Sequence, residues 1–249
     1  MRPGGAAWPR RRSSSPRPCG DGCSLTSAPL TTVAVLPVKR FDRAKQRLSS
    51  GLAGTSREVL AEAMLRDVLG ALARVRSLYE IVVVTREPRA AALARAHDAL
   101  IVEDEAEAGQ SAAASLGVAR AVEFGAERVL MVPGDCPALD PREVAALLAG
   151  QGEGRAVTIV PDRHGTGTNA LLLAPPDVIA PAFGEGSFER HRAAAEASGA
   201  RVAVAEMASL ALDIDTPDDL DALRHADLES ARRRHTPGVL RALAERRPA

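Results

Sequence analysis

Short apolar segments alternate with longer amphipathic segments along most of this chain, and this alternation limits its fold more than any other feature. Seven segments have the length and composition of strands: 31–38, 80–85, 99–104, 128–135, 156–162, 169–175 and 201–207. Several are apolar at consecutive positions, which is typical of strands that are covered by helices on both faces. The pattern therefore predicts an α/β fold with right-handed crossovers and a mostly parallel sheet.

The segments between these strands carry helical patterns. The clearest is TSREVLAEAMLRDVLGALARV, in which Thr55 and Glu58 form a capping-box pattern and apolar residues from Leu60 to Val75 keep helical spacing. Weaker patterns occupy 88–97, 110–124, 141–149, 188–199 and 217–226. Ligands of such folds bind where loops leave the carboxyl ends of the strands, so we expect the functional residues there.

Composition divides the 249 residues into three parts. Residues 1–29 are rich in Pro, Gly, Ser and Arg and have no periodicity, which predicts a disordered tail; a translation start nearer residue 30 is the alternative. Residues 30–226 are expected to form one α/β domain, which is long enough to build a core without disulfides or a metal. Residues 227–249, which contain Pro237, are expected to form a peripheral helical extension.

Charge and composition argue against several classes of function. The 32 basic and 32 acidic residues cancel, so no global field favours nucleic acid or a membrane, and any anion site must be local. One Trp, one Tyr and four Phe are too few for a base-stacking single-strand binder, and they offer no anchor from which to argue an oligomer. Apolar runs are shorter than the roughly 18–20 residues of a membrane span. Three cysteines without zinc-site spacing, and no signal-peptide pattern, favour the cytoplasm.

A dense basic cluster follows the first predicted strand. In PVKRFDRAKQRL, five cations fall within ten residues: Lys39, Arg40, Arg43, Lys45 and Arg47. After a strand end they can converge on a polyanion such as a triphosphate, although a solvated basic loop would give the same pattern. The phosphate-loop and GxGxxG motifs are absent at this position, so neither a P-loop ATPase nor a nicotinamide enzyme is indicated.

Acidic residues follow two other segments. VLMVPGDCP runs directly into Asp135, where a carboxylate between Gly and Pro residues could hold Mg²⁺ against phosphate oxygens; a turn-forming Asp is the alternative. In LDIDTPDDLDAL, Asp213 and Asp215 alternate in an extended segment, so they face one side and could share a cation. Capping of the next helix explains Asp218 and Asp219.

Two glycine-bearing loops bracket the sixth predicted strand. GTGTN and GEGS offer backbone amides and the hydroxyls of Thr166, Thr168 and Ser187 to an anion. Ser187 also opens a predicted helix, whose free amides and dipole favour a phosphate or carboxylate. Glycine turns and a Ser N-cap would explain the same residues structurally. His164 and His191 stand beside no evident nucleophile and are expected at the surface.

A helix that starts with small residues follows the third predicted strand. In EDEAEAGQSAAASLGVAR, Gln110 and Ser111 begin the helix. A flat base could lie against the backbone there while an amide reads its edge. An Ala-rich packing helix with Ser111 as its cap is the alternative.

In chain order, PVKRFDRAKQRL, GQSAAASLG, VPGDCP, HGTGTNALLL, GEGSFERH and LDIDTPDDL resemble the CofC/FbiD family of nucleotidyltransferases over about residues 31–222. These are the 2-phospho-L-lactate or phosphoenolpyruvate guanylyltransferases of deazaflavin coenzyme F-420 biosynthesis. The resemblance implies a Rossmann-like three-layer αβα fold of the nucleotide-diphosphosugar-transferase type. It also implies GTP as donor, Mg²⁺ as cofactor and a phosphorylated three-carbon acid as acceptor.

Molybdopterin guanylyltransferases have a similar fold but carry a glycine-rich loop after the first strand. This chain has Pro37, Val38 and Lys39 there, which favours the narrower family.

The resemblance also implies roles on the nucleotide side. Lys39, Lys45 and Arg47 would neutralise the triphosphate of GTP, and Lys39 and Lys45 would thereby contribute to catalysis. Gln110 and Ser111 would line the site of the base.

Further roles follow for the metal and the acceptor. Asp135 would be a catalytic metal carboxylate, and Asp215 would complete the metal site with Asp213 as its neighbour. A pocket that holds the acceptor's phosphate and carboxylate would be formed by Thr168, Gly184 and Ser187.

Two alternatives keep the fold and change the function. A molybdenum-cofactor or sugar-phosphate nucleotidyltransferase would accept a pterin or sugar phosphate, and a non-catalytic domain would bind GTP without releasing pyrophosphate. The sequence leaves phosphoenolpyruvate, 2-phospholactate and phosphoglycerate open as acceptors, since they differ by a few atoms in one pocket. The Ala and Arg bias is typical of a GC-rich bacterium, which favours phosphoenolpyruvate.

Overall fold

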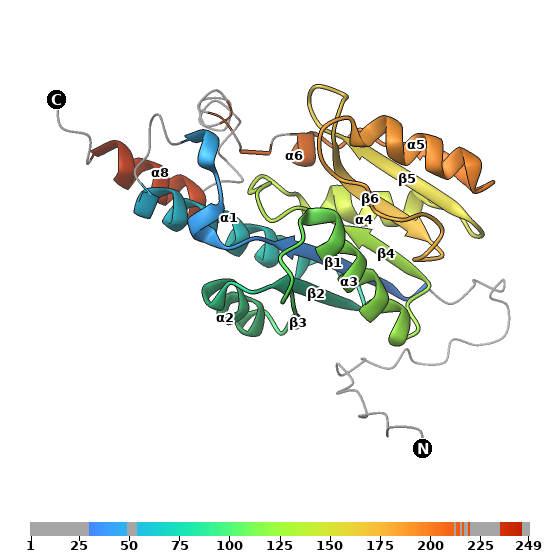
Figure 1. Cartoon of the computed structure of the whole chain (residues 1–249), viewed down its shortest axis with the longest axis horizontal. Coiled ribbons are helices and arrows are strands. Elements are labelled where there is room, and N and C mark those ends of the chain that lie inside the picture. The colour runs from blue at the N-terminus through green and yellow to red at the C-terminus, as the bar shows by residue number, and fades with distance from the viewer. Residues whose placement is uncertain are drawn as a thin grey trace, which may run out of the picture.

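The computed structural model describes residues 30–48, 54–211 and 235–245, together with Asp213, Ile214, Thr216 and Asp219. Within these residues one sheet lies between two layers of helices (Figure 1). The predicted tail at 1–29 lies outside the described residues, and so does the predicted helix at 217–226 except for Asp219.

The sheet has seven strands. In chain order they are β1 (Thr32–Val38), β2 (Glu80–Thr85), β3 (Leu100–Glu103), β4 (Arg128–Met131), β5 (Ala156–Pro161), β6 (Thr168–Ala174) and β7 (Arg201–Val204). Across the sheet the order is β3-β2-β1-β4-β6-β5-β7. β6 runs antiparallel to β4 and β5, and the other pairings are parallel. The predicted α/β, mostly parallel sheet is confirmed, although β4 ends at Met131, sooner than expected.

The helices are α1 (Gly54–Leu72), α2 (Pro88–Ala96), α3 (Gln110–Glu123), α4 (Pro141–Gly150), α5 (Ser187–Ala197), α6 (Ala208–Ala211) and α8 (His235–Glu245), with short 3-10 turns η1 (Phe41–Arg43) and η2 (Gln46–Leu48). α2 and α4 each begin with a proline, and the preceding carboxylates of Glu87 and Asp140 cap them. The capping box predicted for α1 is wrong, because Thr55 lies inside the helix and Glu58 instead contacts Arg89 at 2.7 Å.

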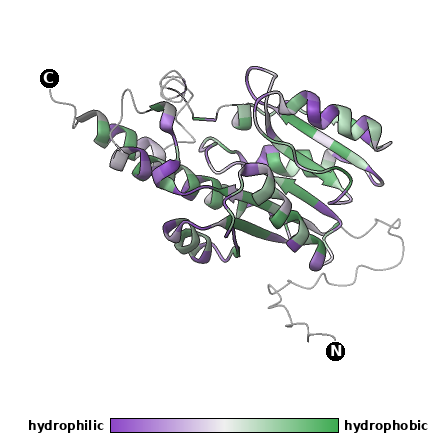
Figure 2. Cartoon of the chain, in the orientation of Figure 1, coloured by the Kyte–Doolittle hydropathy of each residue, from purple (hydrophilic) through white to green (hydrophobic). Residues whose placement is uncertain are grey.

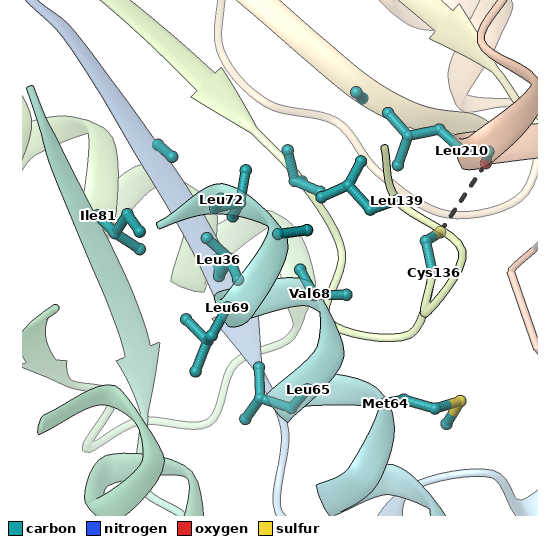
Figure 3. Packing of buried hydrophobic residues seen from close by; sticks show 14 of the residues in the cluster. Leu36, Met64, Leu65, Val68, Leu69, Leu72, Ile81, Cys136, Leu139 and Leu210 are labelled. Atoms are coloured by element: carbon teal, nitrogen blue, oxygen red, sulfur yellow. Dashed lines mark hydrogen bonds between the residues drawn. The ribbon is translucent and has the colours of Figure 1, made fainter. Parts of the chain in front are cut away.

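Two apolar clusters hold the three layers together. One packs α1, α2, α4, α6 and α8 against one face of the sheet, and the other packs α3 and α5 against the opposite face. Figure 2 shows largely hydrophobic strands, with hydrophilic residues on the helices and loops around them. Figure 3 shows Leu65 and Leu69 of α1 beside Leu36 of β1, and the thiol of Cys136 beside the carbonyl of Leu210 at 3.8 Å.

α3 approaches the sheet closely because one of its residues is a glycine. A Cβ atom at Gly117 would lie 2.3 Å from Cγ1 of Val35, well inside van der Waals contact. Glycine at this position, in the middle of α3, therefore lets the helix pack directly on β1.

α8 lies alongside α1, at the end of the molecule away from α5 (Figure 1). The carboxylate of Asp67, in the middle of α1, accepts the backbone N–H groups of His235 at 2.7 Å and Thr236 at 2.9 Å. Asp67 thus caps the first turn of α8, where Pro237 is tolerated because its missing N–H is not needed. Among the described residues, no helix combines the length and hydropathy needed to cross a bilayer.

Candidate functional site

A cavity of about 550 Å³ opens at the carboxyl ends of the parallel strands. Its walls are the loops that follow β1, β2, β3 and β4, the start of α3 and one side of α1. This is the edge at which the fold predicts a ligand site.

Four of the predicted site residues line this cavity: Lys39, Lys45, Gln110 and Asp135. Ser111 follows Gln110 in the first turn of α3, but it is not among the described residues that line the cavity. The side chain of Arg47 lies outside the described part of the structure. The basic loop, Gln110 and Asp135 therefore meet at the edge of the sheet where a ligand was expected.

Lys45 and Asp135 form an ion pair inside the cavity. Nζ of Lys45 donates to Oδ2 of Asp135 at 2.5 Å, and the lysine side chain is only 5% exposed. Lys45 has a φ of 56°, a left-handed conformation uncommon in residues other than glycine. The sequence assigned the lysine to a triphosphate and the carboxylate to a metal; in the structure the two groups contact each other.

The second carboxylate oxygen of Asp135, Oδ1, is buried and has no hydrogen-bond partner among the described residues. A buried acceptor without a partner carries a cost that a bound cation would remove. The carbonyl of Asp135 accepts the N–H of Ile214 at 3.2 Å, so the acidic segment around Asp213 lies beside it. Carboxylate oxygens are the ligands that Mg²⁺ prefers. These residues therefore fit a magnesium ion.

The predicted metal set is only partly described. Asp215 lies outside the described residues, and the described residues contain no cluster of three or more His, Cys, Asp or Glu placed to hold a metal. Asp219 caps as predicted, since its Oδ2 accepts the N–H and hydroxyl of Thr216 at 2.6 and 2.8 Å.

Thr168 and Asn169 are neighbours at the start of β6, and their side chains contact opposite helix layers, through His191 of α5 and Leu210 of α6 respectively. Val160 pairs with Ala170 and Pro161 pairs with Thr168, so Asn169 is an extra residue in the ladder. Nδ2 of Asn169 donates to the carbonyl of Leu210 in α6 at 2.6 Å and lies 3.4 Å from Oδ1 of Asp213.

The three residues predicted to hold the acceptor come from β6 and the loop before α5. Thr168 is buried, and its Oγ1 lies 3.0 Å from Nδ1 of His191. Gly184 is exposed with a φ of 109°, and Ser187 is buried at the start of α5. None of the three is among the described residues that line the cavity.

The free amides predicted at the start of α5 are not found at its first two residues. The N–H of Ser187 donates to the carbonyl of Gly184 at 3.0 Å, and the N–H of Phe188 donates to the carbonyl of Thr166 at 3.2 Å. Carbonyl groups of the two glycine loops thus occupy the N–H groups of Ser187 and Phe188. These two amides are not available to an anion in this structure.

The loop before β6 is organised by Asp162. Its Oδ1 accepts the N–H groups of His164 at 3.1 Å and Thr166 at 3.0 Å. A Cβ atom at Gly167 would lie 2.5 Å from the other carboxylate oxygen, so a glycine is required by this close approach. His164 and Thr166 are exposed on this loop.

The prediction that His191 lies at the surface was wrong, whereas His164 is exposed as predicted. The ring of His191 is 0% exposed, and its Nε2 accepts the N–H of Ala182 at 2.8 Å. Burial lowers the pKa of His191 to about 4, with a smaller contribution from Arg190. Helical spacing could have located it, because Ser187, His191 and Ala195 form an i, i+4, i+8 stripe that is buried throughout.

Glu87 and Arg89, which the sequence patterns did not single out, hold the basic loop in place. Oε2 of Glu87 accepts the N–H of Phe41 at 3.0 Å, and the guanidinium of Arg89 lies 5.0 Å from the centre of the Phe41 ring. Arg89 also pairs with Glu58 of α1. The Glu-Pro pair was a signal for the start of a helix, but nothing local indicated a contact with a loop 46 residues away.

Comparisons with known proteins agree with this geometry. Residues 32–233 match the family model described as "Guanylyl transferase CofC like". A phosphoenolpyruvate guanylyltransferase of Conexibacter woesei is 51% identical over 223 residues, which cover 88% of this chain and 99% of that protein. A 2-phospho-L-lactate guanylyltransferase of Methanothermobacter thermautotrophicus is 34% identical over 207 residues, covering 82% and 89% of the two chains.

A solved structure supports the fold. The crystal structure of a candidate nucleotide-diphospho-sugar transferase from Desulfovibrio desulfuricans superimposes with a TM-score of 0.69 at 18% identity, covering 86% of this chain and 96% of that chain. The predicted Rossmann-like three-layer arrangement is thereby confirmed. The match to the family model spans more than half of the chain. The chain therefore belongs to the CofC-like guanylyl transferase family.

Proposed function

We propose that this protein transfers GMP from GTP to phosphoenolpyruvate and releases pyrophosphate, as a step in the biosynthesis of coenzyme F-420. The observation that carries the proposal is the cavity at the carboxyl edge of the sheet in which the buried Lys45 pairs with the half-buried Asp135, in a CofC-like chain. The 51% identical relative is named for phosphoenolpyruvate and the 34% identical one for 2-phospho-L-lactate, which favours the first acid.

The cavity has the charges that a nucleoside triphosphate needs. Lys39 and Lys45 line it, and so does Gln110 at the start of α3, whose amide can bond the edge of a guanine. A bound triphosphate would offer Lys45 an anionic partner other than Asp135. Charge neutralisation by fixed cations is the main contribution of a protein to transfers of this class.

Asp135 and Asp213, with Asp215 beyond the described residues, would hold a magnesium ion that neutralises phosphate charge when bound. Asp135 has an oxygen available for this role, since Oδ1 is buried without a partner among the described residues. Asn169 would keep Asp213 in place through its contact at 3.4 Å.

The reaction needs no general base. A phosphate oxygen of the acid would form a bond to the α-phosphorus of GTP while the bond from that phosphorus to the bridging oxygen breaks, and pyrophosphate leaves with the electron pair. The attacking oxygen is already anionic at neutral pH. No histidine is among the described residues that line the cavity, which agrees with this mechanism.

The test is pyrophosphate release by the purified protein with Mg²⁺ and GTP, with phosphoenolpyruvate and 2-phospholactate supplied separately and the products identified by mass spectrometry. We expect a guanylylated phosphoenolpyruvate. Release only with a sugar or pterin phosphate would assign the chain to another nucleotidyltransferase activity. Binding of GTP without release under any condition would indicate a non-catalytic domain. Replacing GTP with CTP tests the base preference.

A further inference from the structure

The buried His191 lies between two groups whose hydrogen-bonding roles can be assigned. Its Nε2 lies 2.8 Å from the backbone nitrogen of Ala182, and its Nδ1 lies 3.0 Å from Oγ1 of Thr168. A backbone N–H can only donate, so Nε2 must accept and carries no hydrogen. Burial lowers the pKa of this ring to about 4, so the ring is neutral near pH 7. The single ring hydrogen is therefore on Nδ1.

This tautomer determines what Thr168 can do. Nδ1–H donates to Oγ1, so the hydroxyl of Thr168 is an acceptor toward His191 and its own hydrogen points elsewhere. Among the described residues, no hydrogen bond donated by this hydroxyl is found. Thr168 is the first residue of β6, beside the bulge at the carboxyl edge of the parallel strands. A buried hydroxyl with a spare hydrogen at this edge suits a small anion.

We propose that His191 is a positioning residue for the acceptor, because it fixes the hydroxyl of Thr168 as a donor toward the phosphate or carboxylate of the acid. The inference rests on the proposed function, and on the role in acceptor binding that the family resemblance implies for Thr168. The opposite tautomer would accept a hydrogen from Thr168, and the hydroxyl would then present only lone pairs to an anion.

Arg190, the neighbour of His191 on α5, provides a contrast within the same helix. Its guanidinium donates to the carbonyls of Ala182, Phe183 and Glu185, so it holds the loop before α5 without contacting Thr168 in any described bond. If His191 only anchored this loop, loss of either residue would have the same effect. If His191 instead orients the hydroxyl of Thr168 as a donor, loss of His191 should weaken binding of the acid in a way that loss of Arg190 does not.

Two substitutions separate the two bonds of His191. His191→Asn can keep an N–H near the position of Nδ1, whereas His191→Gln can reach Ala182 with an oxygen but loses the donor to Thr168. We expect His191→Gln to raise the KM for the acid about tenfold, the value of one hydrogen bond to a charged group, with little change in the KM for GTP. His191→Asn should remain closer to the wild type, and Arg190→Ala should not reproduce the difference between them.

A double-mutant cycle gives the decisive comparison. In a Thr168→Val background His191→Gln should add little to the KM for the acid, because the hydroxyl that it would misorient is gone. Additive effects, or equal changes in the KM for acid and for GTP, would overturn the inference. If the wild type turns over no acid, the proposed function fails, and this inference fails with it.

A spectroscopic measurement tests the tautomer without any variant, in case His191→Gln does not fold. Nitrogen-15 NMR of the imidazole near pH 7 should show a hydrogen on Nδ1 and none on Nε2. The reverse assignment would overturn the inference, even in a fully active enzyme.

Discussion

The two ends of the carboxyl edge of the sheet hold their polar groups in different ways. On the side of β1 and β4, Lys45 and Asp135 line an open cavity, and one buried carboxylate oxygen has no partner among the described residues. On the side of β6 and α5, His191 is hydrogen-bonded both to Thr168 and to the backbone N–H of Ala182, and the side chains of His191 and Thr168 are buried.

Under the proposed function, this difference suits one edge of the sheet to two ligands of unequal charge. A triphosphate needs cations that can exchange one anionic partner for another, and an ion pair in a cavity provides that exchange. A small acid needs fixed dipoles, and neutral groups that are already bonded lose little entropy when it binds. The cavity side is therefore expected to be sensitive to changes of charge, and the side at α5 to changes of hydrogen-bond geometry.

Removal of the carboxylate charge at the cavity should have the largest effect. Asp135→Asn leaves Lys45 without its anion and weakens the proposed metal site, so we expect kcat to fall about 100- to 1000-fold. Asp140→Asn is the matched control, because it removes a charge from the same loop while Asn caps α4 as well as Asp does. Near-normal turnover by Asp135→Asn would remove this residue from the mechanism.

Removal of the buried cation should have the next largest effect. Lys45→Met keeps the length of the side chain and loses its charge, so kcat/KM for GTP should fall about 10- to 100-fold while the KM for the acid changes much less. Steady-state kinetics with each substrate varied in turn measures both values. Equal losses for both substrates would mean that the cavity and the α5 side do not bind GTP and the acid independently.

Acid should lower the stability of the folded protein through His191, on the α5 side of the sheet edge. The pKa of this residue is lowered from 6.5 to about 4 by burial, so the unfolded chain binds its proton more readily. The stability that follows from keeping the ring neutral is complete above about pH 6.5 and is lost as the pH falls toward 4. The loss should approach about 3 kcal/mol. Urea unfolding at several pH values measures this slope, and His191→Asn should flatten it; an unchanged slope in that variant would assign the acid sensitivity to other groups.

Removal of Lys39, the exposed cation of the cavity, should have the smallest effect. Lys39→Met removes a charge that lies in solvent at the end of β1, so the KM for GTP should rise only a few-fold. Because exposed charges are screened by salt, the difference from wild type should shrink as ionic strength rises. A loss as large as that of Lys45→Met would show that burial does not distinguish the two lysines.

Local patterns predicted the strands and most helices well. The apolar run EIVVVT coincides with β2, because a strand covered on both faces needs apolar residues at consecutive positions. The same logic placed Asp135 and the lysines at one edge, since parallel strands end together. His191 could have been found by helical spacing, because a buried stripe is a local property.

Contacts between distant segments could not be read from the sequence. The pair of Lys45 with Asp135 joins residues that are 90 apart in the chain. Lys45 also has a left-handed backbone conformation, which sequence patterns predict only at glycine or asparagine. The bulge at Asn169 depends on how β5 and β6 align, which is set by packing rather than by composition.

The contact of Asp67 with α8 has a practical consequence for anyone who shortens or tags this chain. A truncated chain that ends before His235 would leave the carboxylate of Asp67, 8% exposed in the structure, without the two amides that now satisfy it. It would also uncover the part of α1 on which Leu240 packs. The helix near the carboxyl terminus is thus part of the folding unit, and affinity tags belong beyond it rather than in its place.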